Sequence, residues 1–376
     1  MTSRERLLSA ITGKPTDRVP ISTYELVGHN SQAFENNEPS YKKLMDTIRE
    51  KTDCVCMWDL KSNHTVARSS FPVTMEINHK KGENYTDMSL RLHTPKGDLT
   101  SAYRVYDNVH TAWTYEHWCK STEDVDKLLS VPYEPVTYDD SDYDRIRAEV
   151  GERGIIMAGA SDPADCTIPM MRFEDALVWA MTETEHFTKT IEEMHRRNMI
   201  NLENMLKTRM VDLYRICGPE YITPPYLPPA FFNRYVTPYV KEQTELIHSY
   251  GGLVRIHCHG NIDKVLDDIL SCGADALDPC EAPPDGDITL RRLKERTKGR
   301  ICLFGNLQLK LLENADPNEV RDMVRRCMED AKEGGGYIIM PTAAPINIPL
   351  SQKTEENYHV FIETALEYGK YDITKQ

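Results

Sequence analysis

The sequence has no run of eighteen apolar residues, which argues against a membrane-spanning helix. Its first twenty residues, MTSRERLLSAITGKPTDRVP, lack the apolar core and the small-residue cleavage site of a signal peptide. We therefore expect a cytoplasmic protein. Positive charge is also scarce, because 59 acidic residues outnumber 45 basic ones and give a formal net charge of -14. This balance disfavours nucleic acid and anionic membrane surfaces as partners.

Two further absences narrow the class of protein. The ten cysteines do not form a disulfide framework but are scattered, and most lie in apolar runs such as CVCMW and RICLF, which is typical of buried thiols in a reducing compartment. No Gly-rich fingerprint follows any apolar run, so the sequence gives no support for a dinucleotide-binding open sheet.

The second half of the chain has a regular rhythm. From about residue 140, short apolar segments alternate with amphipathic helical ones; the apolar segments are GIIMAGA, VDLYRIC, GLVRIHC, ADALDP, RICLFGN and GYIIMPT. Repeated strand-then-helix units indicate a parallel sheet. Six such units, with earlier material to complete eight, predict an α/β fold of the (β/α)8 TIM-barrel type, with an open doubly wound sheet as the alternative.

The first third of the chain has a different pattern. Residues 3–12 and 40–51 are predicted to be helices. Residues 52–118 alternate polar and apolar side chains between the turn signals KKGEN and PKGD, which indicates an antiparallel β insertion. We therefore expect one barrel domain over residues 1–376, decorated by an N-terminal helical and β-rich insertion at 52–118.

The stretch RIHCHGN, residues 255–261, holds the strongest chemical signal. Side chains alternate faces along a strand, so His257 and His259 lie on one face and Cys258 on the other. A His-x-His pair is a common way to place two imidazoles on one zinc ion. The alternative is that one histidine caps a neighbouring element and the other is exposed to solvent. Because the pair stands at a predicted strand end, the sequence favours neither the zinc site nor the two ordinary histidines over the other.

Other polar residues follow other predicted strands, where a barrel gathers its catalytic groups. Glu281 is the preferred third zinc ligand, and Cys280 is the alternative, although a buried thiol suits it better. Glu220 either orients the substrate or a ligand histidine or forms an ion pair with Arg255. Asn306, at the end of another strand, is a second catalytic candidate.

Several motifs resemble, in order, those of the uroporphyrinogen decarboxylase-like superfamily. They are RERLLSAITGKPTDRVP, RFEDALVWAMTETEHFTKTIEEM, CGADALDPCEAPP, ICLFGNLQ and GGGYIIMPTAAPINIPLS. The resemblance covers the first twenty residues and most of 150–370. It implies a (β/α)8 barrel with an active-site cleft at the C-terminal ends of the strands, and often a homodimer.

The superfamily contains two chemistries. Its decarboxylases hold the carboxylates of a tetrapyrrole with a basic N-terminal loop. The matching stretch here, ISTYELVGHNSQAFENNEPSY, has no Lys or Arg and carries Glu25, Glu35 and Glu38. A polycarboxylate finds little to bind there, so tetrapyrrole decarboxylation is disfavoured and is kept only as the alternative function.

The other branch comprises zinc-dependent methyltransferases that work with corrinoid proteins. They carry a His-x-Cys pair at the strand end occupied here by His257 and His259, and a later cysteine that is missing from MPTAAPIN. Two imidazoles and a carboxylate leave zinc a stronger Lewis acid than thiolates do. The resemblance therefore implies transfer of a methyl group from an O- or N-methyl donor, such as a methoxylated aromatic, to a corrinoid on a partner protein.

The resemblance also suggests residues that contact the donor. Tyr24 and Tyr226 are expected to line an aromatic pocket, and Glu25 and His29 are expected to face the cleft, because the family's substrate loop lies there. Two weaker alternatives are an amidohydrolase-like zinc enzyme and a barrel that binds a ligand without catalysis. The first needs further histidines on later strands, and here the only later histidine is His359.

Overall fold

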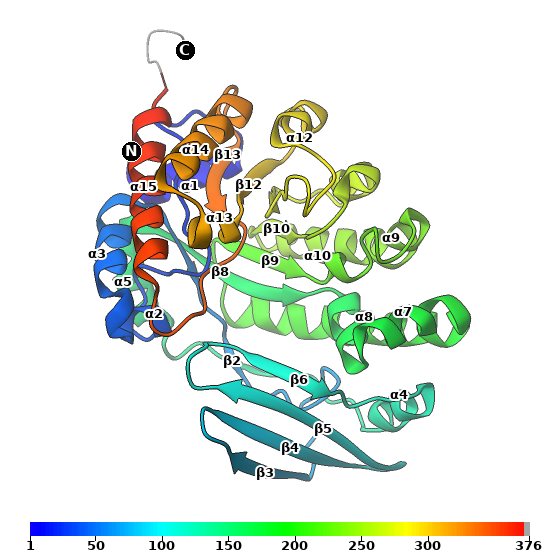
Figure 1. Cartoon of the computed structure of the whole chain (residues 1–376). Helices are drawn as coiled ribbons and strands as arrows, with labels where there is room; N and C mark the ends of the chain where they lie inside the picture. The colour runs from blue at the N-terminus through cyan, green and yellow to red at the C-terminus, as the bar shows by residue number, and fades with distance from the viewer. Residues whose placement is uncertain (372–376) are drawn as a thin grey trace.

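The computed structural model describes residues 1–371. Figure 1 shows a parallel sheet surrounded by helices, with a separate antiparallel sheet beside it. The parallel sheet has the strand order β1-β8-β9-β10-β11-β12-β13. Its strands are β1 (Cys54–Met57), β8 (Gly154–Ser161), β9 (Leu213–Cys217), β10 (Leu253–His257), β11 (Ala276–Asp278), β12 (Cys302–Leu307) and β13 (Tyr337–Pro341).

A short extended segment, residues 19–22, closes this sheet into a ring. The Ser22 amide donates a hydrogen bond to the carbonyl of Ile339 in β13 at 2.9 Å. On the other side, the Asp53 amide, next to β1, donates to the Ile21 carbonyl at 2.8 Å. The segment therefore occupies the eighth strand position, and the predicted (β/α)8 barrel is confirmed.

The closing segment is held by one buried carboxylate. Asp53 is 1% exposed. It accepts hydrogen bonds from the Ile21 amide at 2.9 Å and from the guanidinium groups of Arg6 and Arg18, each at 2.7 Å. Buried charges are stable only when they are paired in this way. Arg18, part of the motif that resembles the superfamily, thus fixes the closing strand.

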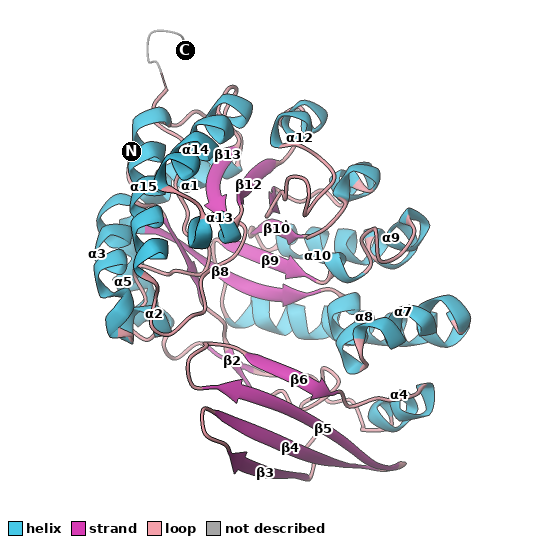
Figure 2. Ribbon diagram, viewed as in Figure 1, coloured by secondary structure: helices cyan, strands magenta, loops and turns pink. Residues whose placement is uncertain are grey.

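Helices cover the outside of the barrel (Figure 2). The longer ones are α3 (Lys42–Lys51), α4 (Thr122–Leu129), α5 (Tyr143–Val150), α7 (Phe173–Thr182), α8 (Thr184–Thr208), α10 (Thr237–Ser249), α12 (Leu290–Thr297), α14 (Pro317–Ala331) and α15 (Gln352–Tyr368). The shorter ones are α2 (Phe34–Asn37), α6 (Pro163–Thr167), α9 (Pro229–Tyr235), α11 (Leu266–Ser271) and α13 (Leu309–Asn314), with 3-10 turns η1 (Pro39–Tyr41), η2 (Gly151–Arg153), η3 (Ile168–Met170), η4 (Pro219–Tyr221) and η5 (Ile262–Lys264). None of the helices described in residues 1–371 has the length and apolarity needed to cross a membrane.

Helix α1 (Ser3–Ile11) fills the interior of the barrel from one end. It begins with a capping box, in which the Thr2 hydroxyl accepts from the Glu5 amide and the Glu5 carboxylate accepts from the Thr2 amide. Its apolar residues Leu7 and Ala10 belong to the inner core cluster, together with inward-facing strand residues such as Phe304. The barrel interior is therefore packed below its functional end.

The antiparallel sheet lies within the range predicted as an insertion, but it begins later than residue 52. It contains β3 (Met75–Lys81), β4 (Tyr85–Thr94), β5 (Gly97–Tyr106) and β6 (Ala112–Glu116). The first part of the range 52–118 instead supplies barrel strand β1, whose short apolar run cannot be told from an insertion strand by alternation alone. A further two-stranded sheet joins β2 (Lys61–Ser62) to β7 (Tyr138–Asp139). The β5–β6 turn is fixed to the segment after β13, because the His110 amide donates to the Ile346 carbonyl at 2.8 Å.

Candidate functional site

The histidine pair lies at the C-terminal end of β10, the mouth of the barrel. His257 is 5% exposed, and its Nδ1 lies 2.9 Å from Asp278 Oδ2. Strand register explains this contact, because His257 is the direct neighbour of Asp278 on β11. Lateral neighbours in a parallel sheet point to the same face. An ionised carboxylate accepts the Nδ1 proton, which leaves Nε2 of His257 for the mouth.

His259 is oriented in the same manner by a second carboxylate. Its Nδ1 lies 3.0 Å from Glu281 Oε1, and its side chain is 37% exposed. The rings of His257 and His259 have centroids 4.6 Å apart and are almost perpendicular, at 87°. Cys258 is buried on the other side, 3.1 Å from the Thr223 hydroxyl, as strand alternation predicts. These four residues, His257, His259, Asp278 and Glu281, are called the histidine cluster below.

The predicted third zinc ligand is used in another way. Glu281 Oε1 faces His259, and Glu281 Oε2 accepts a hydrogen bond from the Gly260 amide at 3.2 Å. The alternative ligand, Cys280, is fully buried and points its thiol to the Leu277 carbonyl at 3.5 Å. Within residues 1–371, no group of three or more His, Cys, Asp or Glu side chains is arranged to hold a metal ion. Two imidazoles suit zinc here, but the side chains as placed do not complete a zinc site.

Two buried arginines lie one step deeper than the histidine cluster. Arg215 on β9 and Arg255 on β10 are direct neighbours in register, and both point into the barrel. Arg255 Nε lies 3.0 Å from Asp278 Oδ1, and its guanidinium stacks 4.9 Å from the Phe304 ring centre. Arg215 is 6% exposed, and its Nε has no hydrogen-bond partner among the described residues. We call Arg215 and Arg255 the arginine pair.

Tyr24 and Glu25, two residues expected from the sequence to face the cleft, cover the arginine pair. Arg215 donates to the Tyr24 hydroxyl at 2.5 Å and to Glu25 Oε1 at 3.4 Å. Tyr24 adopts a left-handed backbone conformation, with φ at 56°, which turns the chain over the mouth. The Glu25 side chain is 47% exposed. A long contact from an exposed carboxylate is weak, so Glu25 adds little to the binding of Arg215.

The charges of the site are distributed unevenly. Burial lowers the pKa of His257 to about 4, although Asp278 acts in the opposite direction. Burial also acts to lower the pKa of His259, but the hydrogen bond and charge of Glu281 outweigh it and raise that pKa. For Asp278, burial is outweighed by Arg255, His257 and Arg215, which hold its pKa well below the usual range. Asp278 is therefore the fixed negative charge of the site.

The two predicted catalytic residues are held by hydrogen bonds to the backbone. Glu220 does not pair with Arg255; its Oε2 accepts from the Gly218 amide at 2.9 Å, and burial raises its pKa. Asn306 donates from Nδ2 to the Cys280 carbonyl at 2.9 Å, and its Oδ1 lies 3.5 Å from the Cys327 thiol. Asn306 thus holds the turn that positions Glu281, and its amide is directed to the protein interior.

One of the predicted substrate contacts, His29, lies outside the cleft. His29 lines a cavity outside the barrel with Arg49, Glu149 and Arg153, so the expectation that it faces the cleft is wrong. After Glu25 the chain turns away from the mouth: Gly28 lies against Arg49 of α3, and the Ser31 amide donates to Glu149 of α5 at 2.7 Å. Tyr226 is 51% exposed, and its ring packs edge-on against Phe173, with the ring centres 4.8 Å apart.

Sequence reasoning missed Asp278 and Arg215. Asp278 precedes Pro279 in ALDPCE. The sequence prediction took Cys280 and Glu281 as the strand end, whereas the strand ends two residues earlier, at Asp278. Arg215 stands in mid-strand in LYRIC, where a charged residue between apolar ones is itself a signal, since arginine is rarely buried unless it is paired.

Comparisons with known proteins agree with this architecture. The family model for uroporphyrinogen decarboxylase (URO-D) matches residues 115–368, more than half of the chain. A curated uroporphyrinogen decarboxylase from Ralstonia pickettii (strain 12J) is 39% identical over 71 residues, which span 19% of this chain and 18% of that protein. A solved methyltransferase from Methanosarcina mazei superposes with a TM-score of 0.61 at 17% identity, covering 98% of this chain and 99% of that one. At this identity, the likeness concerns the fold.

Proposed function

Because the chain belongs to the uroporphyrinogen decarboxylase (URO-D) family, we propose that it is a methyltransferase of this fold. It takes the methyl group of a small O- or N-methyl donor and delivers it to a corrinoid held by a partner protein in the cytoplasm. The observation that carries the proposal is the histidine pair at the mouth, with each Nδ1 held by a carboxylate. A homodimer, which the resemblance implies, stays a prediction.

The histidine pair supports a zinc ion only in part. A carboxylate on one ring nitrogen is the usual arrangement around a metal-ligating histidine, because it fixes the tautomer and raises the basicity of the other nitrogen. His257 and His259 would hold zinc through Nε2, and the remaining positions would need donors other than the described side chains. When bound, zinc supplies Lewis-acid stabilisation of the departing oxygen or nitrogen. Zinc therefore stays a proposal, with no reaction step assigned to it.

The arginine pair supports a donor that carries a carboxylate. Arg215 and Arg255 bring two positive charges into the barrel, and among residues 1–371 Asp278 is the one fully buried carboxylate that contacts the pair. Arginine binds carboxylates through paired N–H groups, and such bonds are strong when buried. A substrate carboxylate that displaces Glu25 would bind Arg215 and be covered by Tyr24. We therefore propose a methoxylated aromatic acid as the donor class.

The reaction balances as a simple displacement. The methyl carbon–oxygen bond of the donor breaks, a carbon–cobalt bond forms, and cobalt(I) of the corrinoid substrate is converted to cobalt(III). The departing oxygen keeps the bonding electron pair and takes a proton from water. The chain's own contribution is to hold the donor carboxylate on Arg215 while the His257 and His259 rings face the mouth, where the acceptor must approach.

Decarboxylation of a tetrapyrrole is the second candidate. The arginine pair also favours it, because a buried cationic pair can bind a carboxylate of either substrate. Against it, Glu25 lies at the mouth, where the resemblance implies a basic loop in decarboxylases. One carboxylate can be satisfied by Arg215, whereas several need more cations than this pair supplies.

The test uses the purified chain, free cob(I)alamin as acceptor and 4-methoxybenzoate as donor. We expect a methylated corrinoid and 4-hydroxybenzoate in equal amounts. His257→Ala and His259→Ala should each slow the transfer about 100-fold or more, while His79→Ala, an exposed histidine on β3, should leave it unchanged. Carbon dioxide release from uroporphyrinogen, with no methyl transfer, supports the second candidate. Metal content measured on the same four proteins tests zinc separately.

A further inference from the structure

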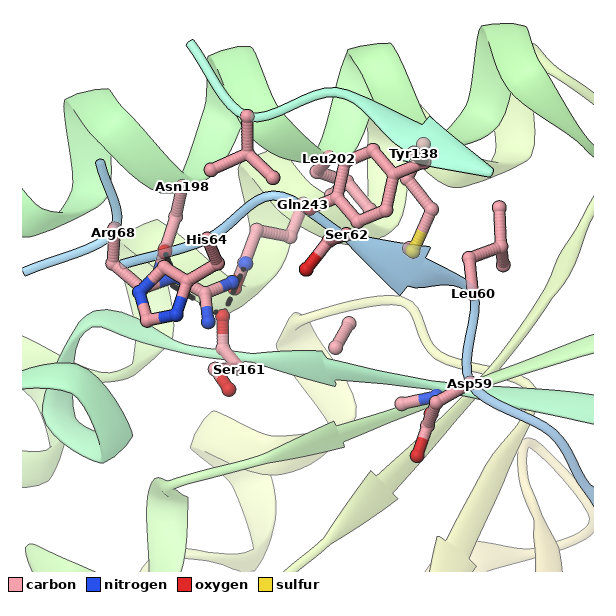
Figure 3. A pocket seen from close by; sticks show the side chains of 14 residues that line it. Asp59, Leu60, Ser62, His64, Arg68, Tyr138, Ser161, Asn198, Leu202 and Gln243 are labelled. Carbon is pink, nitrogen blue, oxygen red and sulfur yellow. Dashed lines mark hydrogen bonds between the residues drawn. The ribbon is translucent and has the colours of Figure 1, made fainter. Parts of the chain in front are cut away.

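A separate cavity lies outside the barrel, between the end of β8 and the helices α8 and α10 (Figure 3). Its volume is about 210 Å³. It is lined by Asp59, Leu60, Ser62, His64, Arg68, Val136, Tyr138, Gly159, Ala160, Ser161, Asn198, Leu202, Met205 and Gln243. It shares no lining residue with the histidine cluster or the arginine pair, so the proposed methyl transfer does not use it.

One end of the cavity is polar and firmly built. Asn198 and Gln243 are 2% and 1% exposed, and both donate to the Ser161 carbonyl, at 3.1 Å and 2.8 Å. Gln243 Oε1 has no hydrogen-bond partner among the described residues. Buried amides are rarely left with unused acceptors unless a water or a ligand satisfies them. Figure 3 shows both amides beside Arg68 and His64.

Arg68 is the charged group of this polar end. Its Nε donates to Asn198 Oδ1 at 2.8 Å, which fixes the plane of the guanidinium. Among residues 1–371, Arg68 forms no ion pair within 4.0 Å, and the side chain to which its Nε donates is the neutral amide of Asn198, so its charge has no counter-ion. Its two remaining nitrogens form the fork that binds carboxylates. A half-buried arginine without a counter-ion is costly unless an anion joins it.

The backbone at this position is strained and held in place. Ala67 and Arg68 have φ angles of 48° and 60°, a region that non-glycine residues rarely adopt. Two side chains of α8 hold them there, because Arg197 donates to the Ala67 carbonyl at 2.8 Å and Asn201 donates to the Arg68 carbonyl at 2.7 Å. Strain that is maintained by surrounding contacts is typical of ligand sites.

The other end of the cavity is apolar. Leu60, Leu202 and Met205 line it with the Tyr138 ring, and Figure 3 places Leu60, Leu202 and Tyr138 away from Arg68. The volume of 210 Å³ lies below the roughly 300–1,000 Å³ of pockets for drug-sized ligands. The ligand must therefore be small, with a charged head and a short apolar tail.

We propose that this cavity is a second binding site, which takes a small aliphatic monocarboxylate. The carboxylate pairs with the Arg68 guanidinium, and the short chain lies against Leu202 and Met205. Asp59 lies at the opposite end from Arg68 in Figure 3, where its carboxylate accepts from the Gly159 amide at 3.0 Å. A dicarboxylate would bring its second charge toward Asp59, so one charge is favoured.

The test is calorimetric titration of the full chain with butyrate, butyramide, butylammonium and inorganic phosphate. We expect butyrate alone to bind. Arg68→Gln should weaken butyrate binding at least about tenfold, which corresponds to about 1.4 kcal/mol. Leu202→Phe, which fills the apolar end and leaves Arg68 in place, should weaken it as well. Arg326→Gln, an exposed arginine on α14, should bind as the parent chain does.

Each other outcome counts against the proposal. No butyrate binding, equal binding of butyramide, or an unchanged affinity in both Arg68→Gln and Leu202→Phe overturns it. Phosphate binding that depends on Arg68 in place of butyrate identifies an inorganic-anion site and overturns the monocarboxylate. Arg215→Gln separates the two carboxylate sites, because it should abolish binding of 4-methoxybenzoate in the barrel but retain butyrate in this cavity.

Discussion

Replacing Asp278 by asparagine probes the electrostatics of the site most sharply, because it removes one charge and almost no volume. Asp278 is fully buried, 3.0 Å from Arg255 Nε and 2.9 Å from His257 Nδ1. Removing one partner of a buried ion pair costs about 3–5 kcal/mol, since the remaining charge is left uncompensated. We expect Asp278→Asn to lower the free energy of unfolding by this amount.

The expected change is measurable as a shift in Tm. For a chain of this length the entropy of unfolding is about 0.8 kcal/mol/K near the midpoint. The loss therefore corresponds to a fall in Tm of about 4–6 °C, read by differential scanning calorimetry. Asp144→Asn, an exposed aspartate on α5, is the matched control and should shift Tm by less than about 1 °C. An unchanged Tm for Asp278→Asn would refute the reasoning.

A double variant separates charge from packing. In Asp278→Asn with Arg255→Leu, the uncompensated guanidinium is gone, so the double variant should be more stable than Asp278→Asn alone. The Arg255 guanidinium also packs against Phe304, and leucine retains part of that contact. A double variant less stable than the single one would show that the lost packing of the Arg255 side chain on Phe304 outweighs the relief of the uncompensated charge.

Two further predictions concern stability elsewhere in the barrel. Gly218→Ala should lower Tm by more than about 3 °C in thermal denaturation, because φ is +125° and the new Cβ would lie 1.8 Å from buried Asp162 Oδ1; a tolerated alanine would mean that Asp162 can move. Glu193 has its pKa lowered to about 2 by Arg196 and Arg197, so its contribution to stability is complete above its unfolded pKa of about 4.3 and is lost as pH falls toward 2. Urea titrations should show that Glu193→Gln removes part of this acid-dependent loss, and a parallel pH profile in both proteins would contradict it.

The barrel could be predicted because its signal is periodic. Each buried strand is a short apolar run before an amphipathic helix, and six such units in succession admit few topologies. The closing strand could not be recognised, since residues 19–22 form a short segment held by Asp53 and by Ile339, which are far away in the sequence. Long-range pairing of this kind leaves no local pattern.

The orientation of the histidine pair could also be predicted from a periodic pattern. Side chains alternate along β10, which separates Cys258 from His257. Its partners were harder to predict. Which residue of β11 faces His257 depends on strand register, and a boundary error of two residues exchanges Asp278 for Cys280. Glu281 was correctly placed beside His259, but the sequence could not tell a metal ligand from a carboxylate that orients the imidazole.

The position of His29 could not be predicted from the local sequence. The resemblance places residues 21–41 over the cleft, and Tyr24 and Glu25 do contact Arg215 there. The chain then turns, and His29 packs outside the barrel beside Arg49. Nothing in the composition of this segment marks that turn, because the left-handed conformation falls on Tyr24, a residue that rarely adopts it.

The most direct test of the proposed function is the transfer of a labelled methyl group from 4-methoxybenzoate to cob(I)alamin by the purified chain and its His257→Ala variant. The expected result is a methylated corrinoid formed in step with 4-hydroxybenzoate by the parent chain, and a rate lower by about 100-fold or more in the variant. Equal rates in the two proteins, or release of carbon dioxide from uroporphyrinogen with no labelled corrinoid, would contradict the role given to the histidine pair.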